Sequence, residues 1–192
     1  YIYRPPFQIP DVQRKYGNLT LTYSSQVHVA VIEIDRDTHN LHILDYAAVD
    51  DCGRVICHEI VKGQVLGSAA HGLGAALMES LTYDEYGNLM TSTFSDYCPI
   101  TVLNMPHVRY GNLESPSPFT FNGAKGMGEG GGGPLHTLSA ALQDALDGLG
   151  VVIRDSHHSP SRLHDLLNAP QESDGVILRT QGKGAPSPHP SH

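Results

Sequence analysis

The chain has 192 residues, 40% of them hydrophobic, which is enough to build the core of one domain. Its formal net charge is −8 and its twelve Lys and Arg residues are scattered, so the composition argues against a nucleic-acid-binding surface. It has no run of eighteen apolar residues that would predict a transmembrane helix. Its three cysteines, Cys52, Cys57 and Cys98, are an odd number, which favours a reducing compartment, here the cytoplasm, over a disulfide framework. They also lack the paired spacing of a structural zinc site, so we expect free thiols.

The first elements along the chain are an arm and a hairpin. Residues 1–20 contain Pro5, Pro6 and Pro10 and few periodic apolar positions, which predicts an extended arm lying on another surface. Residues 26–35 and 41–50 alternate in polarity and are rich in β-branched side chains. Because a turn at 36–40 separates them, they predict an antiparallel β-hairpin.

A helical period replaces the alternation over residues 59–81, where apolar side chains recur on one stripe. Several glycines interrupt this segment, and each costs about 0.5–1 kcal/mol in a helix relative to alanine. We therefore expect a buried helix whose close packing compensates for them. A turn at 83–88 follows, and residues 89–93 and 107–113 are predicted as short strands.

Residues 123–133 form a glycine-rich segment that carries one ammonium, Lys125, and one carboxylate, Glu129. So many glycines indicate positive φ angles or the close approach of another group, although a plain flexible linker is the alternative. A phosphate-binding P-loop does not fit, because no Ser or Thr follows the Gly-Lys pair.

The C-terminal third holds the clearest helix, over residues 134–148, which has proline in its first turn and ends at glycine. A short strand at 151–154 and a helix at 159–167 are predicted next. Residues 170–192 are dominated by Pro, Gly, Ser, Gln and His, so we expect this tail to be disordered.

Six short motifs in one order resemble a known family. They are Asp-Asp-Cys-Gly-Arg-Val-Ile at 50–56, Val-Lys-Gly-Gln-Val-Leu-Gly at 61–67, His-Gly-Leu-Gly-Ala-Ala-Leu-Met-Glu at 71–79, Tyr-Asp-Glu-Tyr-Gly at 83–87, Asp-Tyr at 96–97 and Gly-Ala-Lys-Gly-Met-Gly-Glu at 123–129. Together they resemble the C-terminal part of the molybdenum-binding subunit of the xanthine dehydrogenase, aldehyde oxidase and carbon monoxide dehydrogenase family. This resemblance implies an α+β domain over residues 21–169, with a mixed sheet and packed helices.

The same resemblance implies a molybdenum hydroxylase, which oxidises an electron-poor carbon of an aldehyde, N-heterocycle, purine or carbon monoxide with oxygen derived from water. Its cofactor is molybdopterin, commonly in the cytosine dinucleotide form, and the pterin dithiolene rather than the protein holds the molybdenum. Glu129 stands at the position of the family's general base. The resemblance also implies partner chains that carry 2Fe-2S and FAD, because no iron-sulfur cysteine pattern is present here.

The cofactor contacts implied by the resemblance fall in two places. Asp51, Cys52, Gly53 and Gln64 match segments that lie along the pterin and its nucleotide, and Lys125, Gly126 and Gly128 belong to the glycine-rich segment. An amide such as Gln64 can donate and accept at once, which suits a pterin edge, although polar capping of the helix is the alternative. For Lys125 a local salt bridge is as good an interpretation as an approach to the cofactor.

Some positions depart from the family pattern. Cys57 and His58 stand where the family usually has Asn-Pro, His71 stands where Gln is common, and four glycines after Glu129 predict a looser local wall. The chain is also several times shorter than the family's subunit, so it is either a split subunit or a fragment. These departures keep open a non-catalytic assembly subunit or inactive remnant. A histidine-rich metal carrier rests on composition alone.

Overall fold

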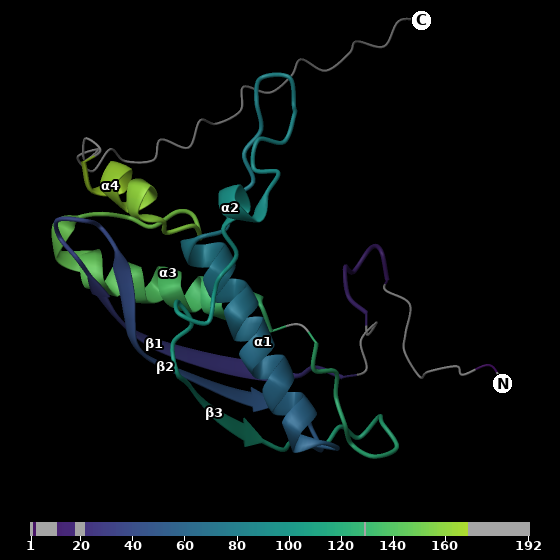
Figure 1. Cartoon of the computed structure of the whole chain (residues 1–192). Helices are drawn as coiled ribbons and strands as arrows, with labels where there is room; N and C mark the ends of the chain where they lie inside the picture. The colour runs from purple at the N-terminus through teal and green to yellow at the C-terminus, as the bar shows by residue number, and fades with distance from the viewer. Residues whose placement is uncertain (1, 3–10, 18–21, 129, 169–192) are drawn as a thin grey trace, which may run out of the picture.

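The computed structural model of the chain describes residues 2, 11–17, 22–128 and 130–168 (Figure 1). Within the predicted arm, residues 11–17 form a tight turn in which the Asp11 N–H donates to the Tyr16 carbonyl at 2.8 Å. Glu129 and the predicted tail at 170–192 lie outside the described residues. The predicted limits of the domain therefore stay predictions. No helix in the described ranges is long and apolar enough to cross a membrane.

A three-stranded mixed sheet forms one layer of the fold. β1 (Ser25–Ile34) and β2 (Leu41–Asp51) pair antiparallel, which confirms the predicted hairpin. β3 (Val108–Leu113) pairs parallel to β2 on its other side, so the strand order is β1-β2-β3. Alternation in β1 and β2 sends successive side chains to opposite faces, which defines an inner face under the helices and an outer face.

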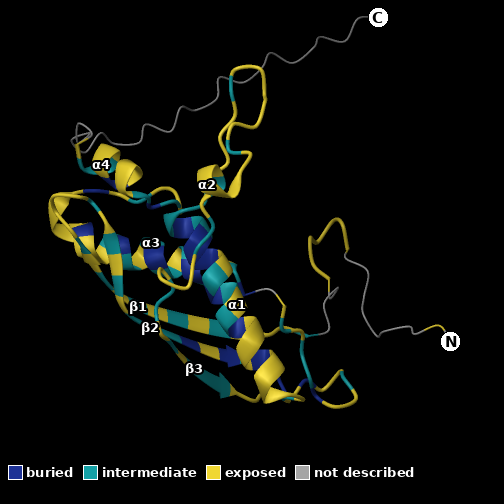
Figure 2. Ribbon diagram, viewed as in Figure 1, coloured by how far each residue is buried: buried dark blue, intermediate teal, exposed yellow. Residues whose placement is uncertain are grey.

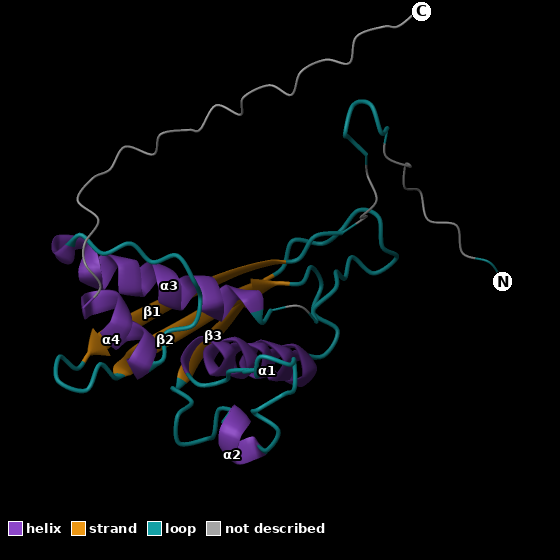
Figure 3. Cartoon of the chain, turned by 90° about the horizontal axis from the view of Figure 1, so that it is seen from above, coloured by secondary structure: helices purple, strands orange, loops and turns teal. Residues whose placement is uncertain are grey.

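Two long helices cover the inner face of the sheet (Figures 1 and 3). α3 (Gly132–Leu146) packs against β1, and α1 (His58–Leu77) packs beside it against β2 and β3. The core lies between these layers, where buried residues gather in Figure 2. Its fully buried members are Tyr46, Ala48, Val65, Ala69, Leu73, Ala76 and Leu138. The α+β class with a mixed sheet and packed helices is thus confirmed.

Smaller elements close the far end of α3. A short 3-10 helix, η1 (Asp147–Leu149), follows α3, and α4 (Pro160–Asn168) lies beyond it. Leu163 of α4 packs against Leu142, Leu146 and Val151 in a second buried cluster. All three cysteines are free thiols, as expected.

Helix α1 differs from its prediction in length and in burial. It ends at Leu77 rather than at residue 81, and only one face is covered. Its glycines divide along its length: a Cβ at Gly67 would meet nothing within 4 Å, whereas a Cβ at Gly72 would lie 2.3 Å from the Gly131 carbonyl oxygen. Close packing therefore compensates for glycine only in the C-terminal half, where α1 crosses the start of α3.

The prediction of a strand at 151–154 is wrong. The side chain of Gln143 makes the hydrogen bonds that a neighbouring strand would otherwise make. The Gln143 amide nitrogen donates to the Val151 carbonyl at 2.9 Å, and the Ile153 N–H donates to the Gln143 amide oxygen at 2.9 Å. This segment is extended, but its backbone groups are satisfied by α3 rather than by a sheet.

The strand predicted at 89–93 is also wrong. Leu89 forms only an isolated bridge with Tyr83 across the turn that Asp84 stabilises. The segment leads instead into a short helix, α2 (Phe94–Tyr97), within a loop that stands away from the body of the fold (Figures 1 and 3). Without a neighbouring strand on the main sheet, its local propensity is not enough to form a ladder.

One of the positions that depart from the family pattern lies at the start of α1. Cys57 occupies the N-cap position, and its side chain makes no capping hydrogen bond. Asparagine is among the best N-cap residues and proline is favoured at the first helical position. The usual Asn-Pro therefore matches a helix start, and Cys57-His58 lacks that cap.

We predict that Cys57→Asn stabilises the protein by about 1 kcal/mol, because the new side chain can accept a hydrogen bond from the first turn of α1. Denaturant unfolding of the purified protein measures the change. Cys57→Ala, which removes the thiol without adding a hydrogen-bond acceptor, is the control and should not stabilise the protein. Equal effects of the two substitutions would contradict the capping role.

The glycines of α1 offer a matched pair of substitutions. Gly67→Ala should stabilise the protein by up to about 1 kcal/mol, since the methyl group enters open space and alanine is the better helix former. Gly72→Ala should destabilise it by about 1–3 kcal/mol, because the methyl group would overlap the backbone of the Gly131 peptide. Thermal unfolding of both variants measures the difference. A stabilising Gly72→Ala would show that α1 and α3 are not in close contact.

Candidate functional site

The end of β2 and the glycine-rich segment are joined through their backbones. The Lys125 N–H donates to the Cys52 carbonyl at 2.7 Å, and the Arg54 N–H donates to the Gly123 carbonyl at 3.1 Å. An isolated bridge between Gly53 and Ala124 lies between these bonds. We call residues 52–54 and 123–125 together the clasp. It fixes the start of the glycine-rich segment at the edge of the sheet.

Glycine is required at the clasp for contacts within the chain itself. Gly53 has a φ of +68°, and a Cβ there would lie 2.3 Å from the Gly123 carbonyl oxygen. Gly123 has a φ of +79° and approaches Pro116 closely. For Gly53, predicted as a cofactor contact, the structure therefore provides a structural reason as well.

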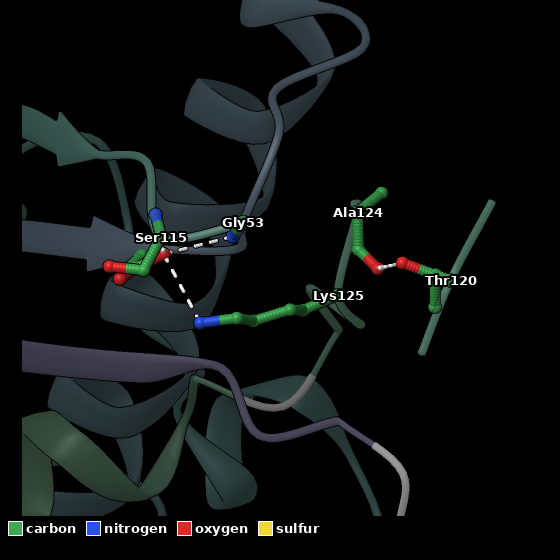
Figure 4. A network of polar contacts seen from close by, with 6 residues as sticks. Gly53, Ser115, Thr120, Ala124 and Lys125 are labelled. Atoms are coloured by element: carbon green, nitrogen blue, oxygen red, sulfur yellow. Dashed lines mark hydrogen bonds and ion pairs between the residues drawn. The ribbon is translucent and has the colours of Figure 1, made fainter. Parts of the chain in front are cut away.

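Lys125 forms a local salt bridge with Asp51, which is one of the two roles that the sequence suggested for it. Its Nζ lies 3.5 Å from Asp51 Oδ1, and the two side chains are only 13% and 15% exposed. In Figure 4 the Lys125 side chain extends toward Gly53 and Ser115, whose N–H groups both donate to Asp51 at 2.9 and 3.0 Å. Burial alone would raise the pKa of Asp51, but these hydrogen bonds and the Lys125 charge lower it to about 2. Asp51 is therefore a carboxylate at neutral pH.

Beyond the clasp the segment runs along the middle of α1. Gly126 and Gly128 are exposed, and a Cβ at either would meet nothing within 4 Å. Gly130 then packs against Ser68 of α1, where a Cβ would lie 2.4 Å from the hydroxyl oxygen. Gln64 is exposed one helical turn before Ser68, on the same side of the helix. Gln64, Gly126 and Gly128 are thus all exposed, and Gln64 lies on the side of α1 where Gly130 packs.

The glycines after position 129 are tightly packed, so the predicted looser wall is wrong for most of them. A Cβ at Gly130 would lie 2.8 Å from the Gln26 amide oxygen as well as close to Ser68. A Cβ at Gly133 would lie 2.7 Å from the His28 ring, and one at Gly131 would lie 3.2 Å from the His71 ring. Only Gly132 faces open space in this run. His71 therefore serves as a packing surface for this segment.

A chain of polar side chains lies behind this segment on the inner face of the sheet. His28 Nε2 lies 3.1 Å from the Gln26 amide oxygen, and His28 Nδ1 lies 2.9 Å from the Tyr46 hydroxyl. A neutral imidazole satisfies both contacts when Nε2–H donates to Gln26 and Nδ1 accepts from Tyr46. Because Gln26 and His28 also touch Gly130 and Gly133, this chain supports the segment that follows Glu129.

Asp50 lies on the same inner face, opposite Gln26 in the strand register. It is 1% exposed, and neither of its carboxyl oxygens has a hydrogen-bond partner among the described residues. Burial raises its pKa, against the opposing effect of the neighbouring Cys52 and Gln26 side chains. The buried Tyr110 hydroxyl on β3 likewise has no partner among the described residues. Asp50 and the Tyr110 hydroxyl are therefore buried polar groups under the helices, next to the apolar core.

Sequence reasoning did not single out Gln26, His28, Tyr46 or Tyr110. A signal was present, because alternation places the polar Gln26 and His28 at positions where the hairpin should face its core. A polar side chain at a core position of a strand is costly unless it is hydrogen-bonded, so it indicates a buried network.

The predicted cofactor contacts separate into two sets. Asp51, Gly53 and Lys125 bind one another at the clasp, and Cys52 is buried there with its carbonyl engaged. Gln64 presents an exposed amide side chain, and Gly126 and Gly128 present exposed backbone. Exposed amide and backbone groups without side chains fit an extended polar ligand such as a pterin nucleotide. In the part of the chain that is described, no group of three His, Cys, Asp or Glu side chains could hold a metal ion.

The polar chain predicts a pH dependence of stability. Burial lowers the pKa of His28, and the nearby Asp50 opposes this only in part. The unfolded chain therefore takes up this proton at a higher pH than the folded protein, so stability should fall as pH drops below about 6.5. One such histidine contributes at most about 1.4 kcal/mol per pH unit. His28→Gln should reduce this slope in unfolding measured from pH 8 to 5, whereas the exposed His107→Gln should not.

Comparisons with known proteins identify the family of this chain. The family model described as molybdopterin cofactor-binding domain matches residues 2–106. The large subunit of nicotine 6-hydroxylase from Paenarthrobacter nicotinovorans is 36% identical over 73% of this chain and 17% of its own length. The carbon monoxide dehydrogenase large chain of Hydrogenophaga pseudoflava is 33% identical over 77% of this chain and 19% of its own.

A solved structure shows the same architecture. Quinoline 2-oxidoreductase from Pseudomonas putida 86 matches with a TM-score of 0.70 and 40% identity, over 74% of this chain and 18% of that one. The chain thus spans less than a fifth of the length of these relatives. It belongs to the molybdopterin cofactor-binding family and is a portion of a molybdenum-binding subunit of the xanthine dehydrogenase, aldehyde oxidase and carbon monoxide dehydrogenase type.

Proposed function

We propose that the chain supplies the catalytic base and part of the cofactor site of a molybdenum hydroxylase, which oxidises an electron-poor carbon with oxygen derived from water. The names of the relatives, which refer to nicotine, quinoline and carbon monoxide, support an N-heterocycle or carbon monoxide as substrate. Aldehydes and purines are the other candidates from the family.

The observation that carries this proposal is the path of the glycine-rich segment. The clasp anchors it at residues 123–125, and Gly130 anchors it again on Ser68. Between these anchors, Gly126 and Gly128 are exposed and present bare backbone directly before position 129. Anchors on both sides of position 129 are suited to hold that side chain against a ligand.

The cofactor that we propose is molybdopterin, in the cytosine dinucleotide form common in the family, and exposed polar and glycine residues of this chain support its binding. Gln64 can donate and accept along an edge of the ligand, while Gly126 and Gly128 let its surface approach the backbone. When bound, the cofactor supplies a metal centre that accepts electrons from the substrate. Lys125 is neutralised by Asp51, so we assign it to ordering of the segment rather than to direct charge on the cofactor.

Glu129 is the residue to which we assign proton transfer. Its position matches the general base of the family, and a carboxylate in a partly dry site can have its pKa moved toward the working pH. Gln26, His28 and Tyr46 support the following glycines and so hold the end of the segment in place.

The whole enzyme requires more chains than this one. We propose that the remaining portion of the molybdenum-binding subunit completes the pocket, and that separate iron-sulfur and FAD proteins remove the electrons. Free thiols at all three cysteines suit the reducing cytoplasm, which is the compartment that we propose.

A non-catalytic assembly subunit or inactive remnant is the alternative, favoured by the departures at Cys57, His58 and His71. In the structure Cys57 acts at a helix start and His71 packs against Gly131. Metal and pterin analysis of the purified complex distinguishes the two functions, because a remnant should contain neither.

We predict that Glu129→Gln lowers kcat by at least about 10²-fold, equivalent to roughly 2.7 kcal/mol of transition-state stabilisation. The amide keeps the shape of the side chain but cannot take the proton, so molybdenum and pterin contents should stay near those of the wild type. Glu114→Gln, at an exposed residue after β3, is the control and should leave turnover unchanged. Full metal loading with normal reduction by substrate in Glu129→Gln would remove this residue from the mechanism.

A further inference from the structure

The outer face of the sheet is apolar and exposed, opposite the face that α1 and α3 cover (Figure 3). We propose that this face is the surface on which the remaining portion of the molybdenum-binding subunit packs. This rests on the proposed function, because it concerns the partner that completes the subunit. The apolar side chains of this outer face and their exposed fractions are Val27 63%, Val29 57%, Val31 51%, Leu44 60%, Val49 38% and Leu113 64%.

The strand register makes these side chains one contiguous surface. Val27 lies opposite Val49, and Val29 lies opposite Ala47, on neighbouring antiparallel strands. Directly opposed side chains on one face of such a pair are in contact distance. Gly111 of β3 lies beside Val49 and adds no side chain, so the surface stays flat toward the third strand.

The outer face carries few charged side chains, and they do not form a basic surface. Arg109 and Asp45 form an ion pair between β3 and β2 on this face. Glu33, near the end of β1, is an exposed carboxylate on the same face. Without an excess of basic side chains the face does not suit a nucleic acid. Single exposed apolar residues are normal on proteins, but a contiguous apolar patch usually marks an interface.

The size of the relatives identifies the occupant. In them the matching segment is about a sixth to a fifth of one polypeptide, so four-fifths of the subunit must pack around it. The inner face is already occupied by this chain's own α1 and α3. The outer face is an apolar sheet surface available for that contact, and a second layer about 10 Å away would bury it as in other two-layer domains.

A photo-crosslinking experiment on the native complex tests the proposal. The photoreactive residue p-benzoylphenylalanine replaces Val29 on the outer face or, as the matched control, Val152 beside α3, which is also 57% exposed. We expect position 29 to crosslink to peptides of the remaining molybdenum-subunit portion, in another chain or in the same longer polypeptide, at least several-fold more than position 152. Crosslinks to a second copy of this chain, to the iron-sulfur or FAD protein, or no excess over position 152 would overturn it.

Charge substitutions provide a second measurement. Val29→Lys should lower the yield of assembled complex at least tenfold relative to Val152→Lys, because an ammonium would be buried at the interface. Both side chains are exposed in the chain itself, so its circular dichroism should not change. Equal assembly of the two variants would contradict the interface.

Neither measurement requires turnover, so this proposal and the proposed function can fail separately. The crosslink can be repeated in the Glu129→Gln complex, where it should be unchanged. A normal rate in that variant would remove Glu129 from catalysis and leave the interface standing, whereas loss of the crosslink in an active complex would remove the interface alone.

Discussion

Backbone pairing in the clasp is the interaction on which the rest of the site depends. It joins the end of β2 to a segment far away in the sequence through hydrogen bonds at Lys125 and Arg54. Because these are main-chain bonds, they fix the direction of the glycine-rich segment and not only its distance from the sheet. The partly buried ion pair of Asp51 and Lys125 reinforces the same contact through the side chains. Without the clasp, residues 126–128 would lose their anchor at the edge of the sheet.

Glycine has distinct physical roles within this small site. At Gly53 it permits a positive φ and a close backbone approach, and at Gly72 it lets two helices cross nearly in contact. At Gly126 and Gly128 it leaves open space, which is useful only if something else comes to that edge. The same residue type therefore marks both the most tightly packed and the most accessible positions of the segment.

The two faces of the sheet illustrate how a partial subunit is organised. The inner face combines an apolar core with a polar chain through Gln26, His28 and Tyr46, and it is covered by the chain's own helices. The outer face is rich in apolar side chains and is not covered by the described residues. Burial of apolar area is the main favourable term in folding and in association. A partner layer on this face would therefore stabilise the domain further.

Elements with local signals could be predicted from the sequence. Alternation at 26–50 predicted the hairpin, proline in the first turn predicted α3, and the order of six motifs indicated the family. How far α1 is buried, the role of Gln143 in satisfying residues 151–153, and which glycines are in close contact became visible in the folded chain. The physical reason is that periodicity and capping depend on neighbours along the chain. Burial and close approach depend instead on partners distant in sequence, such as Gly131 for Gly72 and Gly123 for Gly53.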